Sequence, residues 1–165
     1  MKNWIALSFL GVLFFAGCNG DDGITYPAPE WEENVAFVAA DGTPDAQIDL
    51  FVAANNMDTV VTESGLVYVI LEPGSSERPS ANSRIVAWYK GYTVDGTIFD
   101  QSGSTPFTSS LTNLIQGWQE GIPLLGKGGK MWMLLKPELA YGDRPPSSDI
   151  TTTSVLVFEI ELADF

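Results

Sequence analysis

The sequence contains no histidine and one cysteine, Cys18, in 165 residues. Catalytic sites that need a histidine base, such as the Ser-His-Asp and Cys-His types, are therefore excluded. A metal site with histidine ligands is excluded as well. A single cysteine cannot form a disulfide within the chain. These absences leave functions that need no histidine base, no histidine-bound metal and no internal disulfide.

Basic residues are also scarce. The chain has 8 lysines and arginines against 21 aspartates and glutamates, so its formal net charge is −13. Nucleic acid is excluded as an expected partner, because a chain this acidic repels phosphates instead of releasing their counterions. The chain is 45% hydrophobic and 12% aromatic, which is typical of a packed globular domain.

The first residues predict an export signal. Lys2 precedes a nearly pure apolar run over residues 4–16. Thirteen helical residues reach only about 20 Å, whereas a bilayer core measures roughly 30 Å, so a signal peptide fits better than a membrane-spanning helix. Ala16 and Gly17 lead into Cys18, and this order resembles the bacterial lipobox, in which the cysteine after the cleavage site carries lipid.

We therefore expect a lipoprotein signal peptide at residues 1–17 and a lipid bilayer as a partner through acylated Cys18. Several acyl chains anchor a protein stably where one does not. The alternative is an ordinary signal peptide followed by a chance cysteine. Asp21 and Asp22 resemble an early acidic signal for outer-membrane display in Bacteroidetes lipoproteins. The expected location is the cell envelope, lipid-anchored, at the outer membrane.

An acidic region follows the cysteine. Residues 19–63 contain ten acidic residues and no basic one. Pro27 and Pro29 disfavour a helix, so residues 18–42 are interpreted as an extended, solvated tether. Residues 43–63 form a helical extension, in which Thr43-Pro44-Asp45 is typical of a helix start and the helix covers residues 44–56.

From residue 64 onwards the pattern is typical of strands. Apolar and β-branched runs occupy residues 66–71, 84–94, 97–100, 130–136 and 154–162, and Asp95-Gly96 predicts a hairpin turn. The last run alternates, with Leu156, Phe158, Ile160 and Leu162 on one face of the predicted strand. Between the strands, residues 114–125 form the one helical candidate. Four or five antiparallel strands and one short helix make an α+β domain over residues 64–165.

Seven short motifs occur in a fixed order in this domain: Tyr89-Lys90-Gly91, residues 95–100 (DGTIFD), Pro106-Phe107, residues 114–121 (LIQGWQEG), residues 126–130 (GKGGK), residues 139–142 (LAYG) and residues 156–162 (LVFEIEL). Their order, spacing and residue types resemble the FKBP-type peptidyl-prolyl cis-trans isomerase family over residues 64–165. The predicted helix at 44–56 and the segment 63–66 (ESGL) resemble the front extension of exported FKBP-like lipoproteins of Bacteroidetes.

The resemblance implies a twisted antiparallel sheet wrapped around one short helix, preceded here by an N-terminal helix. It implies an isomerase that encloses and desolvates an X–Pro amide in an aromatic pocket, with proline-containing polypeptides as clients and no metal or other cofactor. The catalytic residues that it implies are Tyr89, Phe99, Asp100, Trp118, Tyr141 and Phe158. The substrate-binding residues that it implies are Phe107, Leu114, Ile115 and Ile150.

One segment departs from the family pattern. After Tyr141 the family usually continues to an Ile-Pro-Pro sequence, whereas here Ile150 is followed by Thr151-Thr152. Two alternatives to an isomerase that assists folding of envelope or exported proteins therefore stay open. One is a non-catalytic FKBP-like chaperone or binding module of an envelope complex, which the altered loop favours. The other is a surface lipoprotein whose aromatic residues stack on sugars.

The anchor can be tested directly. We expect Cys18→Ser to accumulate as an unprocessed precursor and to lose labelling by radioactive palmitate, because the thiol is the predicted site of acylation. Wild-type protein that is never labelled and occurs free in the periplasm would contradict the lipobox interpretation.

Overall fold

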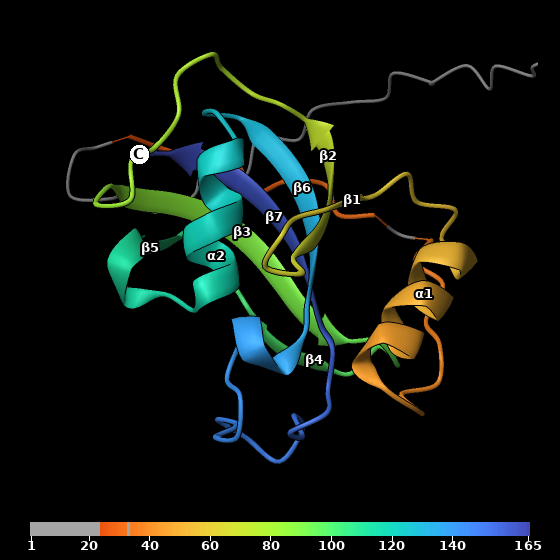
Figure 1. Ribbon diagram of the computed structural model, residues 1–165. Coiled ribbons are helices and arrows are strands. Elements are labelled where there is room, and N and C mark those ends of the chain that lie inside the picture. The colour runs from red at the N-terminus through yellow and green to blue at the C-terminus, as the bar shows by residue number, and fades with distance from the viewer. Residues whose placement is uncertain (1–23, 33) are drawn as a thin grey trace, which may run out of the picture.

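The computed structural model describes residues 24–32 and 34–165. The predicted signal peptide and Cys18 lie outside the described residues. Within them, no helix combines the length and the apolar character needed to cross a bilayer. The elements, in chain order (Figure 1), are α1 (Pro44–Ala54), β1 (Val60–Val61), β2 (Val67–Glu72), β3 (Arg84–Thr93), β4 (Ile98–Gln101), β5 (Phe107–Ser110), η1 (Leu111–Asn113), α2 (Gln116–Gly121), η2 (Ile122–Leu124), β6 (Gly129–Leu135), η3 (Pro137–Leu139) and β7 (Leu156–Asp164).

The strands form one antiparallel sheet of seven strands, ordered β1-β2-β6-β7-β3-β4, with β5 also paired to β3. The long strand β3 pairs with β5 along its first half and with β4 along its second half. Helix α2 lies across one face of the twisted sheet, and α1 lies on the other side (Figure 1). The predicted α+β class, the short helix against the sheet and the N-terminal helix are confirmed.

Strand β7 divides the interior into two cores. Leu156, Phe158, Ile160 and Leu162 point to the front core, which α2 covers with Trp118. Val155 and Val157 point to the back core, on the face that α1 covers. Strand β6 alternates in the same way, with Met131, Met133 and Leu135 in the front core and Trp132 and Leu134 in the back core. A sheet buried on both faces needs this two-residue period on its central strands.

Helix α1 begins where its sequence predicts. The Thr43 side chain accepts a hydrogen bond from the Ala46 backbone N–H (3.3 Å), and Pro44 takes the first helical position. The helix ends at Ala54, two residues before the predicted end, because Asn55 caps it and Asn56 has a positive φ of 49°. Phe51 is fully buried beside Trp132, with their ring centroids 6.1 Å apart.

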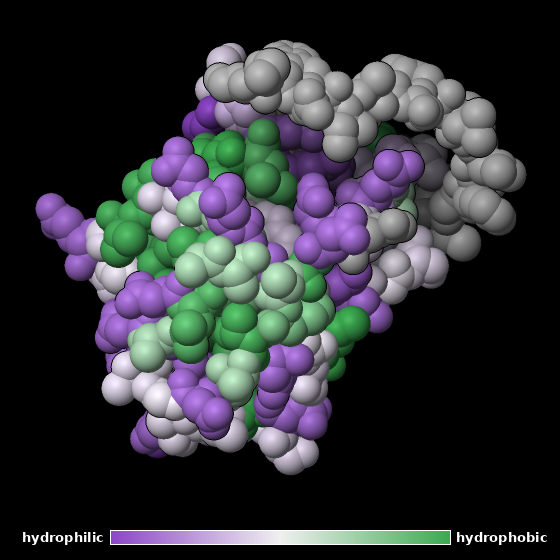
Figure 2. All heavy atoms as spheres, turned by 90° about the vertical axis from the view of Figure 1, so that its right-hand side faces the viewer, coloured by the Kyte–Doolittle hydropathy of each residue, from purple (hydrophilic) through white to green (hydrophobic). Residues whose placement is uncertain are grey.

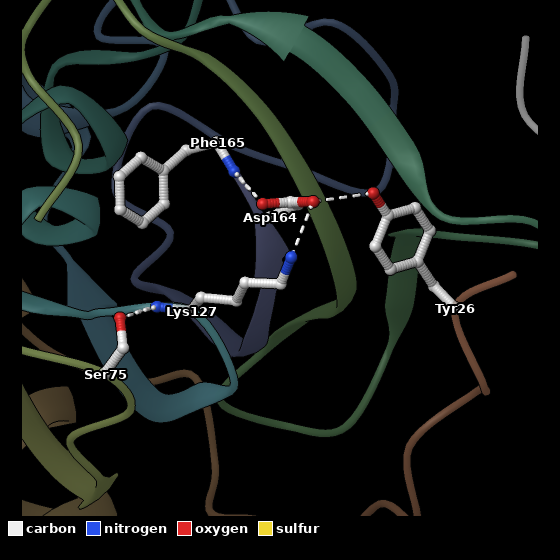
Figure 3. Close-up of polar contacts among 5 residues, drawn as sticks. All are labelled: Tyr26, Ser75, Lys127, Asp164 and Phe165. Carbon is white, nitrogen blue, oxygen red and sulfur yellow. Dashed lines mark hydrogen bonds and ion pairs between the residues drawn. The ribbon is translucent and has the colours of Figure 1, made fainter. Parts of the chain in front are cut away.

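The predicted tether differs from the structure in one respect. The described part of residues 24–38, here called the strap, is extended but lies against the back of the sheet. The Tyr26 hydroxyl donates to Asp164 Oδ2 (2.8 Å), which also pairs with Lys127 (Figure 3). Further along, the Glu32 N–H donates to Glu159 Oε1 (2.9 Å) and the Val38 N–H donates to the Val94 carbonyl (2.8 Å). Ala36 also exchanges two hydrogen bonds with the Asn55 side chain at the end of α1 (2.8 and 2.9 Å), so the strap is attached to both the sheet and the helix.

The amino-acid composition did not predict these contacts of the strap. The acidic residues of the strap indicated a solvated spacer, yet Val35 and Val38 pack against the back core. Glu159, a buried carboxylate of β7, accepts bonds from the strap and from the Tyr92 hydroxyl (2.9 Å), and its burial raises the pKa of the Glu159 carboxyl. A sheet face that carries such a group needs a covering segment that supplies donors.

The extension also adds to the sheet, since β1 pairs with β2. Figure 2 shows the side of the molecule that carries α1, where apolar side chains gather among hydrophilic ones. Leu50 belongs to this outer surface and is 53% exposed, whereas its neighbour Phe51 points inward. Two adjacent residues of α1 thus face opposite sides, Leu50 towards solvent and Phe51 towards the back core.

This contrast predicts the energetic role of α1. Phe51→Ala should lower the free energy of unfolding by about 3–5 kcal/mol, because it leaves a cavity beside Trp132. Leu50→Ala on the same helix should change it by less than about 0.5 kcal/mol. Urea unfolding of both variants measures the difference. Equal and small effects would mean that α1 is an appendage that contributes nothing to the core.

Candidate active site

A pocket of about 200 Å³ opens on the front face of the sheet, at the start of α2. Eight of the ten residues predicted from the family resemblance line it: Tyr89, Asp100, Phe107, Leu114, Ile115, Trp118, Tyr141 and Phe158. They come from β3, β4, β5, α2 and its preceding turn, the segment after η3, and β7. The fold thus gathers residues up to 69 positions apart, from Tyr89 to Phe158, around one hollow.

Trp118 forms the floor of the pocket and is 4% exposed. Its ring meets Tyr89 and Phe158 edge to face, with centroid distances of 5.3 and 5.5 Å. Phe107 stands edge-on to it at 6.2 Å. Such perpendicular contacts fix ring orientations, because the positive edge of one ring meets the negative face of another.

Gly117 allows Trp118, the floor of the pocket, to lie close to the sheet. Gly117, at the first turn of α2, faces the Leu135 side chain of β6 so closely that a Cβ atom would overlap with it. The helix therefore lies near the sheet, and Trp118 reaches the front core between β3 and β7. An alanine at this position would push the helix, and the tryptophan with it, away from β6.

The start of α2 supplies the opposite side of the pocket. Ile115 is the N-cap residue, and Leu114 precedes it. The Gln119 side-chain amide donates to the Leu114 carbonyl (2.7 Å), which holds this turn. Among the described residues, the Ile115 N–H donates no hydrogen bond to the protein, as is usual for the first amides of a helix. It is therefore available to a ligand carbonyl.

The polar groups of the pocket are Asp100 and two tyrosines. The Tyr89 hydroxyl donates to Asp100 Oδ2 (2.7 Å), and the Gln101 N–H donates to Oδ1 (2.9 Å). Burial, reinforced by the bond to Asp100, raises the pKa of Tyr89 far above its ordinary value. Burial and then the Asp100 charge also raise the pKa of Tyr141. Both phenols are therefore protonated at neutral pH, and Tyr89 donates its proton in the hydrogen bond to Asp100.

Two predicted residues lie outside the lining. Phe99 is half-buried and packs edge-on against the lining ring of Phe158 (5.5 Å). Ile150 is buried in the front core. The family pattern names positions but not whether each side chain reaches the pocket lining. Asn113, at the end of η1, lines the pocket and was not predicted, because no motif includes it.

The bond between Tyr89 and Asp100 can be measured. We expect a double-mutant cycle of Tyr89→Phe and Asp100→Ala to give a coupling energy of about 1 kcal/mol in the free energy of unfolding, since the acceptor is charged but reaches solvent. Strictly additive effects would contradict this hydrogen bond.

Comparisons with known proteins match the same part of the chain. The model of the family "FKBP-type peptidyl-prolyl cis-trans isomerase" covers residues 75–163. The isomerase FkpA of Buchnera aphidicola subsp. Schizaphis graminum is 41% identical over 106 residues, which are 62% of this chain and 42% of that protein. FkpA of Escherichia coli K12 is 40% identical over 105 residues, or 62% of this chain and 38% of that protein.

Solved structures agree. The crystal structure of Escherichia coli FkpA superposes with a TM-score of 0.64 at 35% identity, covering 73% of this chain and 55% of that one. A peptidyl-prolyl cis-trans isomerase from Pseudomonas syringae pv. tomato gives a TM-score of 0.64 at 30% identity, covering 72% of this chain and 90% of that one. The chain thus spans about two fifths of the two FkpA sequences. With this fold, these motifs and this match, the chain belongs to the FKBP-type peptidyl-prolyl cis-trans isomerase family.

Proposed function

We propose that the protein is a peptidyl-prolyl cis-trans isomerase that assists the folding of envelope or exported proteins. The observation that carries this proposal is the pocket itself: five aromatic residues line a space of about 200 Å³ beside a free backbone N–H. The proposal concerns the domain that matches the family, which is the part shared with the relatives.

The reaction explains why such a pocket is sufficient. Rotation about an X–Pro bond meets a barrier of about 18–20 kcal/mol, because the C–N bond has partial double-bond character. At the top of the barrier the amide is twisted, its nitrogen is more pyramidal, and it is less well solvated by water than the planar form. A site that favours the twisted amide over the planar one lowers the barrier, and no bond to the protein forms.

Each part of the pocket has a place in this chemistry. We assign Trp118 as the surface under the proline ring, with Tyr89, Phe107 and Phe158 as the surrounding walls. These rings exclude water from the bond. The Ile115 N–H and the Tyr141 hydroxyl are the donors for substrate carbonyls, and Asp100 orients Tyr89. Leu114 closes the side next to Ile115.

The loop over residues 143–153 supports the second candidate, a non-catalytic module that binds partner chains. Where the family usually has prolines, Thr151 and Ser154 form a hydroxyl-bonded turn: the Thr151 N–H donates to Ser154 Oγ (2.9 Å), and the Ser154 N–H donates to the Thr151 carbonyl (3.2 Å). The polar turn replaces the family's prolines, while the rings that line the pocket are all retained.

We also propose that the protein is anchored in the cell envelope through acylated Cys18, on the outer membrane, where it meets proline-containing clients. The support is the order of Lys2, the apolar run at 4–16 and Ala16-Gly17-Cys18 in the sequence. The absence of any basic residue between Lys2 and Arg78 keeps this part of the protein from binding anionic lipid headgroups electrostatically.

The proposal predicts how substitutions in the pocket act. Trp118→Leu should lower kcat/KM for an X–Pro peptide in a protease-coupled assay by about ten- to a hundred-fold, because the floor shrinks and water enters. Asp100→Asn should cost less, because the amide still accepts a hydrogen bond from Tyr89. Phe165→Leu, an equivalent change outside the lining, should leave the rate unchanged.

Melting curves of all three variants separate a lost pocket from a lost fold. A folded Trp118→Leu variant with wild-type turnover contradicts the assignment of the pocket. A wild-type protein that has no turnover but slows aggregation of an unfolded client supports the binding module instead.

A further inference from the structure

Strand β4 forms one side of the pocket, yet it is the edge of the sheet. It carries Asp100 in the lining and Phe99 packed against the lining ring of Phe158. In the described sheet β4 pairs with β3 alone, and the register shifts between Gly91 and Tyr92. Ile98, at the start of β4, is 50% exposed. A short edge strand beside a bulge is held by few contacts, so its position depends on what else touches it.

The turn before β4 is stiff. The Thr93 hydroxyl donates to Asp95 Oδ1 (2.5 Å), and the Thr97 N–H donates to the same oxygen (3.1 Å). The Gly96 N–H donates to the Thr93 carbonyl (2.9 Å), which closes the turn. A turn bonded in this way moves as a unit, so a contact made to the turn also restrains β4.

The strap makes that contact from behind the sheet. The Val38 N–H donates to the Val94 carbonyl at the first corner of the turn. The neighbouring Phe37 ring lies against Gly96 so closely that a Cβ atom there would come within 2.9 Å of it. The same ring meets Tyr92 edge-on at 5.6 Å. Gly96 has a φ of +94°, so both its backbone conformation and this close approach require a glycine.

Burial of Phe37 contributes only part of the stability that a buried phenylalanine could supply, because the residue is 45% exposed. Its buried side touches the turn and Tyr92, and the turn leads within three residues to Phe99. We propose that Phe37 is a positioning residue: through the turn at 94–97 it holds β4, and with it Phe99 and Asp100, in the arrangement that closes the pocket. This proposal rests on the proposed isomerase function.

The proposal predicts an effect on substrate binding. Without the Phe37 ring, β4 occupies the position that closes the pocket for only a fraction of the time. The apparent affinity for substrate is then the wild-type affinity multiplied by that fraction. If the fraction is about one fifth, Phe37→Ala raises KM about five-fold. The value of kcat stays near that of the wild type, because a bound proline ring packs against Tyr89 and Phe158, which contact Asp100 and Phe99 of β4, and so favours the closed position of that strand. Phe37→Leu keeps an apolar group on the turn and restores KM.

The full-length protein serves for the test, with kcat and KM measured well below the melting temperatures of all variants. Tyr26→Phe is the matched control, since it removes the bond between the strap and Asp164 at the other end of the strap and leaves the turn alone. We expect this control to keep the wild-type KM. A Phe37→Ala variant with unchanged KM overturns the proposal, and so does an equal rise in KM for Tyr26→Phe, which would mean that any loosening of the strap suffices.

A second measurement does not depend on catalysis. Amide hydrogen exchange, followed by NMR, should become faster in Ile98–Gln101 of Phe37→Ala and stay unchanged in β6. If the wild type has no isomerase activity, the proposed function fails, and the exchange experiment alone decides whether Phe37 holds β4. Unchanged exchange in β4 overturns the role of Phe37 whatever the activity.

Discussion

Strands β3, β7 and β6 lie side by side and bury side chains on both of their faces, and the other parts of the molecule depend on that constraint. On the front face, Phe158 of β7 and Tyr89 of β3 meet Trp118, and together they form the floor and two walls of the pocket. On the back face, Val157 and Trp132 need the cover that α1 and the strap supply. A change that shifts β7 would therefore disturb the pocket and the N-terminal segments at the same time.

The composition and the site agree on the type of chemistry. A chain without histidine lacks the commonest side chain for proton transfer, and rotation about an amide needs only shape, exclusion of water and hydrogen bonding. The pKa of the Tyr89 phenol is raised, so this group keeps its proton at neutral pH and donates its hydrogen bond to Asp100. We infer that the aromatic enclosure supplies most of the rate enhancement.

Two kinds of sequence pattern correctly predicted local structure, because each reflects a strong local rule. The alternation of Leu156, Phe158, Ile160 and Leu162 predicted that they share one face of β7, because neighbouring side chains of a strand must point to opposite faces. Thr43-Pro44 predicted the start of α1, because a hydroxyl cap and a proline both suit a first turn. Family motifs added the residues that line the pocket, which no local rule brings together.

What escaped prediction depends on contacts between distant segments. The strap reads as an acidic tether, since only the folded sheet offers Glu159, Val94 and Asp164 to its backbone and to Tyr26. That Phe99 and Ile150 lie outside the lining follows from how the neighbouring residues pack, which motif spacing does not encode. The short strands β1 and β5 are too brief to show a period, and they form because β2 and β3 present unpaired edges to them.

The central claim is that the enclosed pocket speeds rotation about an X–Pro amide without transfer of a proton. Exchange NMR on a proline-containing peptide, recorded with the wild-type protein in H2O and in D2O, measures this directly because it follows the cis and trans forms themselves. The account predicts that the protein accelerates their interconversion and that the acceleration is nearly the same in both solvents. An unaccelerated exchange would contradict the claim that the pocket is catalytic, and a markedly slower catalysed rate in D2O would contradict the absence of proton transfer.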